Sequence, residues 1–184
     1  SYCGCTKWHY RTCDSGSCNY GAWGNWGSCG GGYYCGPGGS TGSCFVAGTL
    51  VTMADGTAKP IEDIVVGDRV LAYDTTLGVP VASVVTQTFV HDDAPDPIVV
   101  VNGTLRATAN HPFYANGSWV RADELRAGDA LVGVDGVSAL SATLSSVELG
   151  SVAPRVYNIE VAGQHNYFAG GVLVHNKEAG SGGV

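Results

Sequence analysis

All the cysteines of this 184-residue chain lie in its first quarter, and this uneven distribution constrains the fold more than any other feature. Six of the seven occur before residue 36, the seventh is Cys44, and none follows it. So short a segment cannot bury a large apolar core, and clustered cysteines of this kind are typical of a disulfide framework made in an oxidising compartment. We therefore expect two kinds of structure, divided at the Ser43–Cys44 peptide bond, in a secreted or cell-surface protein.

Residues 1–43 also contain glycine-rich stretches with aromatic residues between them, which favours disulfide-stapled loops over regular helices or strands. We expect the aromatic side chains to form a small core; the alternative is a binding surface for an unknown ligand. Spacing alone does not select one disulfide pairing. A zinc site made of Cys3, Cys5 and His9 fits less well, because the chain has no Cys-x-x-Cys pair.

The net charge of −7 is carried almost wholly by the residues after Cys44, since Asp14 is the single acidic residue before it. Phosphate binding needs clustered Lys and Arg, so nucleic acid is not expected as a partner. No long apolar stretch and no secretory signal segment occurs, so neither a membrane span nor a signal peptide is expected. The lone methionine, Met53, is internal, which indicates a mature fragment or an excised piece.

From residue 44 onward, short runs rich in β-branched and aromatic residues alternate with turn signals, and this pattern predicts an all-β domain. Asn102–Gly103 and Asn116–Gly117 each predict a tight hairpin, and a third hairpin is expected between residues 70–73 and 79–88. Further strands are expected at residues 142–149, 155–161 and 171–174.

An internal repeat also points to a compact β domain. Residues 62–71 align without gaps with residues 123–132. Each copy has an acidic turn, an apolar anchor, a glycine where the backbone must bend sharply, and a strand. Two such copies predict two β units related by a pseudo-twofold axis.

Cys44 is the candidate nucleophile, because a thiolate is the best side-chain nucleophile near neutral pH when a base or positive field favours it. Attack on the carbonyl carbon of Ser43 would turn the Ser43–Cys44 amide into a thioester, an N–S acyl shift. The shift needs a proton for the departing amine and donors for the developing oxyanion.

The segment 108–111 can supply this help. Thr108 and Asn110 share one face of an extended strand, and a turn before Pro112 can bring the His111 imidazole beside them. We expect His111 to protonate the departing Cys44 amine and Thr108 to hold the scissile amide. The alternative for His111 is a hydrogen-bonded turn residue at the end of a strand.

At the other end, an apolar strand leads into His175 and Asn176. The Asn176 side-chain nitrogen can attack its own carbonyl carbon, which would cleave the chain before Lys177 and leave a succinimide. We expect His175 to polarise that carbonyl or protonate the leaving amine, and His165 to assist the Asn176 side chain, because histidine can act as acid or base near neutral pH. Taken separately, both histidines can equally be surface residues at strand ends.

Six motifs occur in order, at residues 44–49, 61–68, 108–111, 156–161, 165–168 and 174–176. Together they resemble the Hint domain, the fold shared by inteins, bacterial intein-like domains and hedgehog autoprocessing domains. The resemblance covers residues 44–176 and implies a flattened, horseshoe-like β fold with both junctions at its centre.

The resemblance also implies roles for individual residues. Cys44 matches the first-residue nucleophile, and Thr108 and His111 match the Thr-x-x-His motif that activates the N-terminal junction. His165 matches the histidine ahead of the last strand. His175 and Asn176 match the His-Asn pair that ends the domain in the family.

Two positions depart from the family pattern. Lys177 stands where splicing members carry Cys, Ser or Thr, and a protonated amine is a poor acceptor for the N-terminal segment. Asn158 stands where many members carry Asp, and an amide cannot act as a general base. Asn110 and Asn158 are auxiliary candidates, and cleavage is favoured over splicing or sterol transfer.

The sequence thus predicts a self-processing domain at residues 44–176, between a leaving segment, residues 1–43, and a tail, residues 177–184. It is a single-turnover enzyme that needs no cofactor or metal, acts on its own flanking polypeptides, and uses water or a small thiol to resolve the thioester. One alternative is splicing, or transfer of residues 1–43 to another nucleophile. Another is a non-catalytic secreted module on an inactive Hint scaffold. Pairing of Cys44 with an upstream cysteine would block cleavage until a reductant acts.

Overall fold

A computed structural model describes residues 10–14, 17–21, 27–29, 33–35, 43–92, 97–151, 153 and 155–176. The chain divides into two compact units, Ser1–Ser40 and Thr41–Val184. In the first unit, β1 (Tyr10–Asp14) pairs antiparallel with β2 (Ser17–Gly21), and β3 (Gly27–Cys29) pairs with β4 (Tyr33–Cys35), where the sequence had indicated loops. The predicted disulfide framework and the Cys3, Cys5 and His9 alternative lie outside the described residues and side chains.

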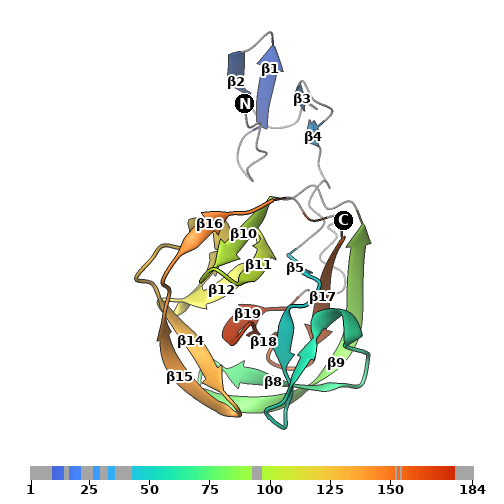
Figure 1. Cartoon of the computed structure of the whole chain (residues 1–184), viewed down its shortest axis with the longest axis vertical. Helices are drawn as coiled ribbons and strands as arrows, with labels where there is room; N and C mark the ends of the chain where they lie inside the picture. The colour runs from blue at the N-terminus through green and yellow to red at the C-terminus, as the bar shows by residue number, and fades with distance from the viewer. Residues whose placement is uncertain are drawn as a thin grey trace. The chain divides into compact units, whose positions relative to one another are not determined.

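The second unit is an all-β structure, and no α-helix occurs among its described residues. Its strands are β5 (Phe45–Val46), β6 (Leu50–Thr52), β7 (Ala58–Pro60), β8 (Arg69–Asp74), β9 (Val79–Asp92), β10 (Ile98–Val101), β11 (Leu105–Thr108), β12 (Pro112–Ala115), β13 (Ser118–Arg121), β14 (Ala130–Asp135), β15 (Ser138–Thr143), β16 (Val147–Leu149), β17 (Arg155–Val161), β18 (Asn166–Ala169) and β19 (Val172–His175). One sheet has the order β16-β10-β11-β5-β17-β9-β8, and the other runs β13-β12-β14-β19-β18-β6-β7, with β15 paired to β14. The long strands β9, β14 and β15 curve around the interior of the unit (Figure 1). The predicted all-β fold is confirmed.

The hairpins follow the local turn signals. β10 pairs with β11 across Asn102–Gly103, and β12 pairs with β13 across Asn116–Gly117. Both asparagines have positive φ, 52° and 51°, and each is followed by a glycine that also has positive φ. Two consecutive residues of this kind make the turn whose twist matches paired strands. The expected hairpin of β8 and β9 also forms, whereas the run expected at residues 142–149 is divided between β15 and β16.

The internal repeat appears as two copies of one turn. Each copy starts with a single 3₁₀ turn, η1 (Ile61–Asp63) or η2 (Ala122–Glu124), and continues through a glycine of φ 94° or 97° into β8 or β14. In each copy an aspartate accepts a backbone N–H three residues earlier, Asp68 from Val65 (3.0 Å) and Asp129 from Arg126 (2.8 Å). The predicted repeat is therefore confirmed in three dimensions.

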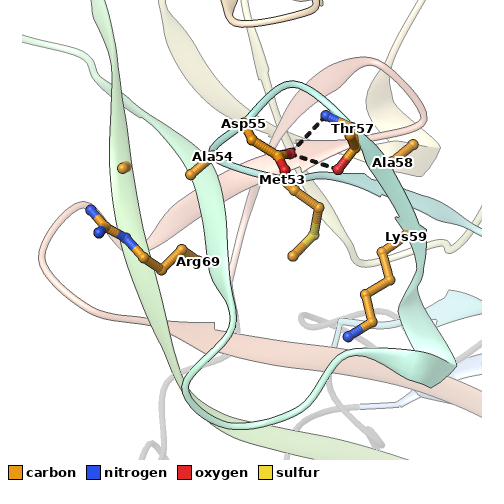
Figure 2. Close-up of a pocket in the computed structure, with 8 residues that line it drawn as sticks. Met53, Ala54, Asp55, Thr57, Ala58, Lys59 and Arg69 are labelled. Carbon is orange, nitrogen blue, oxygen red and sulfur yellow. Dashed lines mark hydrogen bonds between the residues drawn. The ribbon is translucent and has the colours of Figure 1, made fainter.

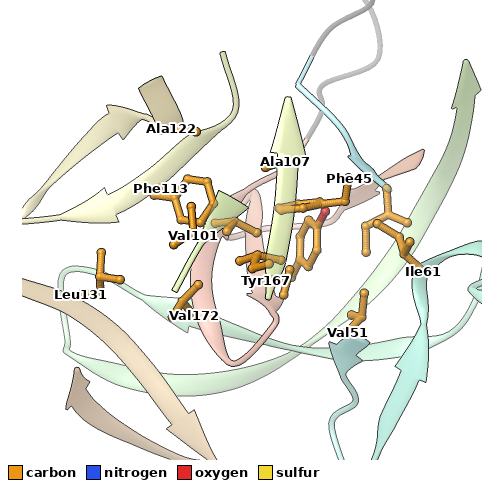
Figure 3. Packing of buried hydrophobic residues seen from close by; sticks show 14 of the residues in the cluster. Phe45, Val51, Ile61, Val101, Ala107, Phe113, Ala122, Leu131, Tyr167 and Val172 are labelled. Carbon is orange, nitrogen blue, oxygen red and sulfur yellow. The ribbon is translucent and has the colours of Figure 1, made fainter. Parts of the chain in front are cut away.

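The core lies between the two sheets, and aromatic rings form its middle. Phe45 packs edge-on against both Phe113 and Tyr167, each with ring centroids 6.4 Å apart, and all three side chains are fully buried (Figure 3). Aromatic side chains contribute the largest apolar area to a core of this size. Because Phe45 follows Cys44 directly, this packing fixes the strand that carries the candidate nucleophile.

Strand β18 is buried along its whole length. The Asn166 side chain joins it to β8, since its Oδ1 accepts the Tyr73 N–H (2.8 Å) and its Nδ2 donates to the Tyr73 carbonyl (2.9 Å). Among the described residues, no helix is long and apolar enough to cross a membrane.

Candidate active site

The strand that begins at the Ser43–Cys44 bond lies between two others in its sheet. β5 pairs on one side with β11, where Phe45 is opposite Ala107, and on the other with β17, where Phe45 is opposite Tyr157. Antiparallel register therefore places Thr108 and Asn158 on either side of Cys44. Cys44 is completely buried, among apolar residues that include Ile98 and Val156.

Thr108 holds the nitrogen of the Ser43–Cys44 amide. The Cys44 N–H donates to Thr108 Oγ1 (2.9 Å), and the Thr108 N–H donates to the Cys44 carbonyl oxygen (2.9 Å). The Thr108 hydroxyl in turn donates to Asn110 Oδ1 (2.7 Å). Asn110 thus directs the hydroxyl proton away from Cys44, so that a lone pair of Thr108 Oγ1 faces the amide.

Asn158 holds the oxygen of the same amide. Its Nδ2 donates to the Ser43 carbonyl oxygen. Its Oδ1 accepts two hydrogen bonds, from the Tyr167 hydroxyl (2.9 Å) and from the Ile159 N–H (2.8 Å). A backbone N–H can only donate, so Ile159 fixes which end of the Asn158 amide faces Ser43.

His111 lies at the turn where the chain passes from β11 in one sheet to β12 in the other. The His111 N–H donates to the Thr108 carbonyl (2.9 Å), and the Ala122 N–H of η2 donates to the His111 carbonyl (2.9 Å). β12 pairs with β19 so that Phe113 is opposite Val174. This register brings the His111 side of the turn to the last strand, while Thr108 stays beside Cys44.

The His111 ring is fully buried and packs against Phe45 in a tilted arrangement, with ring centroids 4.0 Å apart. Burial lowers the pKa of His111 from 6.5 to about 3, and the backbone groups of His175 and Cys44 only partly offset this. The ring is therefore neutral near pH 7. A carbonyl can only accept, so Nε2 carries the proton in its hydrogen bond to the His175 carbonyl oxygen (3.1 Å). Nδ1 is buried and makes no hydrogen bond of ordinary geometry among the described residues, although the Cys44 backbone lies close enough to the ring to raise its pKa slightly.

At the C-terminal junction, His175 Nδ1 donates to the Asn176 carbonyl oxygen (2.8 Å), so it polarises the carbonyl that the Asn176 side chain would attack. Trp119 packs edge-to-face on the His175 ring, with centroids 4.9 Å apart. Tyr114 in turn packs edge-on against Trp119, with ring centroids 5.0 Å apart. The aromatic contacts restrict the rotation of the His175 imidazole.

Asn176 is buried and held by backbone groups. Its N–H donates to the His165 carbonyl oxygen (3.0 Å). With the amide oriented so that Nδ2 donates to the same carbonyl (2.6 Å), Oδ1 accepts the Val161 N–H (2.9 Å). The opposite orientation gives a single long bond to the Val161 carbonyl (3.3 Å), so we assign the first one.

His165 contributes through its backbone. Its imidazole is exposed, and its φ of 54° turns the carbonyl toward Asn176. The described contact with Asn176 is therefore made by the His165 carbonyl, whereas the sequence had suggested the ring.

The structure thus gathers Ser43, Cys44, Thr108, Asn110, His111, Asn158, His175 and Asn176 around one turn, with Lys177 outside the described residues. Two contributors had no predicted role. Tyr167 lies within the motif at residues 165–168, and burial raises its pKa well above the usual range, with a further increase from Cys44, so it remains a neutral donor. Trp119 follows the Asn116–Gly117 turn, and this sequence context gives no signal of its contact with His175.

A pocket of about 640 Å³ lies elsewhere, at the β6–β7 hairpin (Figure 2). It is lined by Met53, Ala54, Asp55, Thr57, Ala58, Lys59, Arg69 and Ala82. Two of its charged groups have structural partners, since Asp55 accepts from the N–H (3.0 Å) and Oγ1 (2.6 Å) of Thr57, and Lys59 pairs with Asp68 (2.7 Å). None of the candidate site residues lines it. Within the described ranges, no three His, Cys, Asp or Glu side chains gather as metal ligands.

Comparison with known proteins agrees with this architecture. A model of the pretoxin HINT domain matches residues 50–177. The bacterial intein-like domain from Clostridium thermocellum is 29% identical, with a TM-score of 0.62 over 72% of this chain and 98% of that domain. The DnaB intein from Synechocystis sp. PCC 6803 is 21% identical, with a TM-score of 0.66 over 74% of this chain and 100% of the intein, and this likeness concerns the fold.

A shorter match links the chain to the Tiggy-winkle hedgehog protein of Danio rerio. The two are 59% identical over 34 residues, which is 18% of this chain and only 8% of the hedgehog protein. The predicted Hint resemblance is confirmed by the family model and by the solved structures. Because the family model takes in well over half of the residues and solved intein-like structures share the fold, this chain belongs to the pretoxin HINT domain family.

Proposed function

We propose that residues 44–176 cleave the chain at both of their ends, by an N–S acyl shift at Ser43–Cys44 and by cyclisation of Asn176. The observation that carries the proposal is that one turn serves both junctions. Thr108 accepts the N–H of Cys44, while His111, three residues later, donates to the carbonyl of His175. A turn histidine bonded only within its own turn, which was the alternative for His111, would not reach the His175 carbonyl of a separate strand.

At the N-terminal junction, the neutral His111 acts first as a base. Nδ1 accepts the thiol proton of Cys44 as the sulfur bonds to the Ser43 carbonyl carbon and the carbonyl electrons move to oxygen. When this tetrahedral centre collapses, the C–N bond breaks and the His111 proton passes to the Cys44 amine. The low pKa of His111 opposes the first transfer and favours the second, because its charged form is disfavoured in the core.

At the C-terminal junction, Asn176 Nδ2 attacks the Asn176 carbonyl carbon. The His165 carbonyl accepts a hydrogen bond from Nδ2, which increases the electron density on that nitrogen, and His175 Nδ1–H stabilises the developing oxyanion. The C–N bond to Lys177 breaks, the proton lost by Nδ2 passes to the departing α-amine of Lys177, and a succinimide remains. The products are residues 1–43, the Hint domain and residues 177–184.

The cysteine-rich composition of residues 1–43 supports a secreted or cell-surface setting. Water or a small thiol then releases the first segment from the thioester. Splicing would instead require transfer of that segment to a nucleophile in the tail, where Lys177 is the first residue.

The test is the intact mass of the purified 184-residue chain over time, with and without hydroxylamine, which cleaves thioesters but leaves disulfides intact. We expect fragments ending at Ser43 and at Asn176. Cys44→Ala should abolish the first cleavage and Asn176→Ala the second. Both cleavages persisting in the double variant would overturn the proposal, and an unchanged wild-type mass would support an inactive scaffold. A product joining residues 1–43 to the tail would favour splicing.

A further inference from the structure

Asn158 stands where related domains often carry an acidic residue, yet it contacts the reacting amide directly. Its Nδ2 donates to the Ser43 carbonyl oxygen and also lies 3.4 Å from Ser43 Oγ. The carbonyl oxygen is the atom that becomes negatively charged when a thiolate adds to the Ser43 carbon. A donor already aimed at that atom stabilises the charge without reorganising.

We propose that Asn158 is a catalytic oxyanion donor for the N–S acyl shift, and that Tyr167 and Ile159 are the positioning residues that aim it. This inference rests on the proposed acyl shift. Asn158 is 1% exposed, so its side chain donates from the protein interior, where hydrogen bonds are electrostatically stronger than in water. The geometry assigns to an amide a donor role that a carboxylate at this position cannot perform while ionised.

The amide orientation is fixed by its surroundings. Oδ1 accepts from two donors, the Tyr167 hydroxyl (2.9 Å) and the Ile159 N–H (2.8 Å), so a rotation that exchanged Oδ1 and Nδ2 would bring Nδ2 against the Ile159 donor. The Tyr167 ring packs on Phe45, and burial keeps the hydroxyl protonated. The scissile amide is thus held at both ends of its C–N unit, by Thr108 at nitrogen and by Asn158 at oxygen.

In the addition step, Asn158 acts only as a hydrogen-bond donor and transfers no proton. The Cys44 sulfur bonds to the Ser43 carbon, the carbonyl π pair moves to oxygen, and the thiol proton passes to His111. Asn158 keeps both Nδ2 protons and strengthens its hydrogen bond as the charge develops. The thioester carbonyl that forms on collapse remains within reach of the same donor.

The test measures the rate at which hydroxylamine releases residues 1–43 from the full chain, corrected for the folded fraction. Removing one oxyanion donor typically lowers the rate by about 100-fold, and we expect this for Asn158→Ala. Asn158→Asp should be at least as slow at pH 8, and its rate should rise as the pH falls and the carboxyl becomes a donor. Tyr167→Phe removes one of the two groups that aim the amide, so we expect a loss of about 10-fold.

Asn166→Asp is the matched control, because Asn166 is an equally buried amide that bonds to the backbone of Tyr73. It should destabilise the fold and leave the rate per folded molecule unchanged. The inference is overturned if Asn158→Ala releases the segment at the wild-type rate, or if Asn158→Asp is faster than wild type at pH 8, as a general base would be. Absence of hydroxylamine-dependent release from the wild-type chain would instead overturn the proposed acyl shift itself.

Discussion

The burial of His111 predicts a loss of stability in mild acid. Its pKa is about 3 in the folded chain and has the ordinary value of 6.5 when unfolded. As the pH falls below 6.5, the unfolded chain binds a proton that the folded chain does not bind. The contribution is therefore fully present above about pH 7 and is lost progressively as the pH falls toward 3.

The size of the loss follows from the pKa difference. Each pH unit between the two values costs about 1.4 kcal/mol, so lowering the pH from 7 to 5 should reduce the free energy of unfolding by roughly 2 kcal/mol. Several aspartates, among them Asp68 and Asp129, also have lowered pKa values in the folded chain. Their contribution to stability is lost only as the pH falls through and below the ordinary value of 3.8, so it changes little between pH 7 and pH 5. With an ordinary urea dependence, the midpoint should fall by about 1 M.

Urea unfolding at pH 7 and pH 5 measures this loss, in a Cys44→Ala, Asn176→Ala background that cannot cleave itself. His111→Gln in the same background should start less stable at pH 7 but lose little stability between pH 7 and pH 5. His165→Asn is the matched control, because it removes an exposed histidine and keeps a residue that tolerates positive φ.

Two results would refute the reasoning. One is an equal pH-dependent loss in the His111→Gln protein, which would place the responsible proton elsewhere. The other is a flat pH dependence of the parent protein, which would mean that the His111 ring is not held neutral in the core.

Thr108→Val should slow release of residues 1–43 by at least about 10-fold while Thr108→Ser retains it, because the hydroxyl accepts the Cys44 N–H; mass spectrometry with hydroxylamine measures both. Trp119→Ala should slow cleavage after Asn176 more than Trp119→Phe does, because an aromatic edge restrains His175, and release of the tail measures it. Gly170→Ala should destabilise the fold by about 2 kcal/mol or more in urea, since its φ is 56° and a Cβ would lie 2.9 Å from Leu105. Gly171→Ala is its control, with φ of 79° and open space, and should cost about 1 kcal/mol.

Local features of the second unit could be predicted from sequence because their causes are local. Asn102–Gly103 and Asn116–Gly117 supply two residues of positive φ, which few other pairs tolerate. The repeated turn carries its own glycine and its own aspartate acceptor in each copy. Such signals require no knowledge of which strands lie side by side.

The contacts of the candidate site depend on strand register between distant segments. Asn158 reaches Ser43 because β17 pairs with β5, and no turn links these strands to reveal their alignment. The burial of His111 likewise depends on the pairing of β12 with β19, which places the His175 carbonyl beside the His111 ring. The positive φ of His165 had only a weak signal, since histidine is enriched at such positions but is still most often found in ordinary backbone conformations.

The two junctions are contacted by different side chains around the turn between β11 and β12. The Thr108 hydroxyl contacts the Cys44 junction and the Trp119 ring contacts His175, so changes to these side chains should each affect one cleavage. His111 belongs to both, because its Nε2 supports the His175 carbonyl while its Nδ1 lies on the Cys44 side. A proton taken up at Nδ1 strengthens Nε2–H as a donor, and it therefore tightens the bond to the carbonyl that precedes Asn176. Under the proposed acyl shift, the one ring that contacts both junctions is therefore charged only until its proton passes to the Cys44 amine, and it strengthens the bond to the His175 carbonyl during that interval.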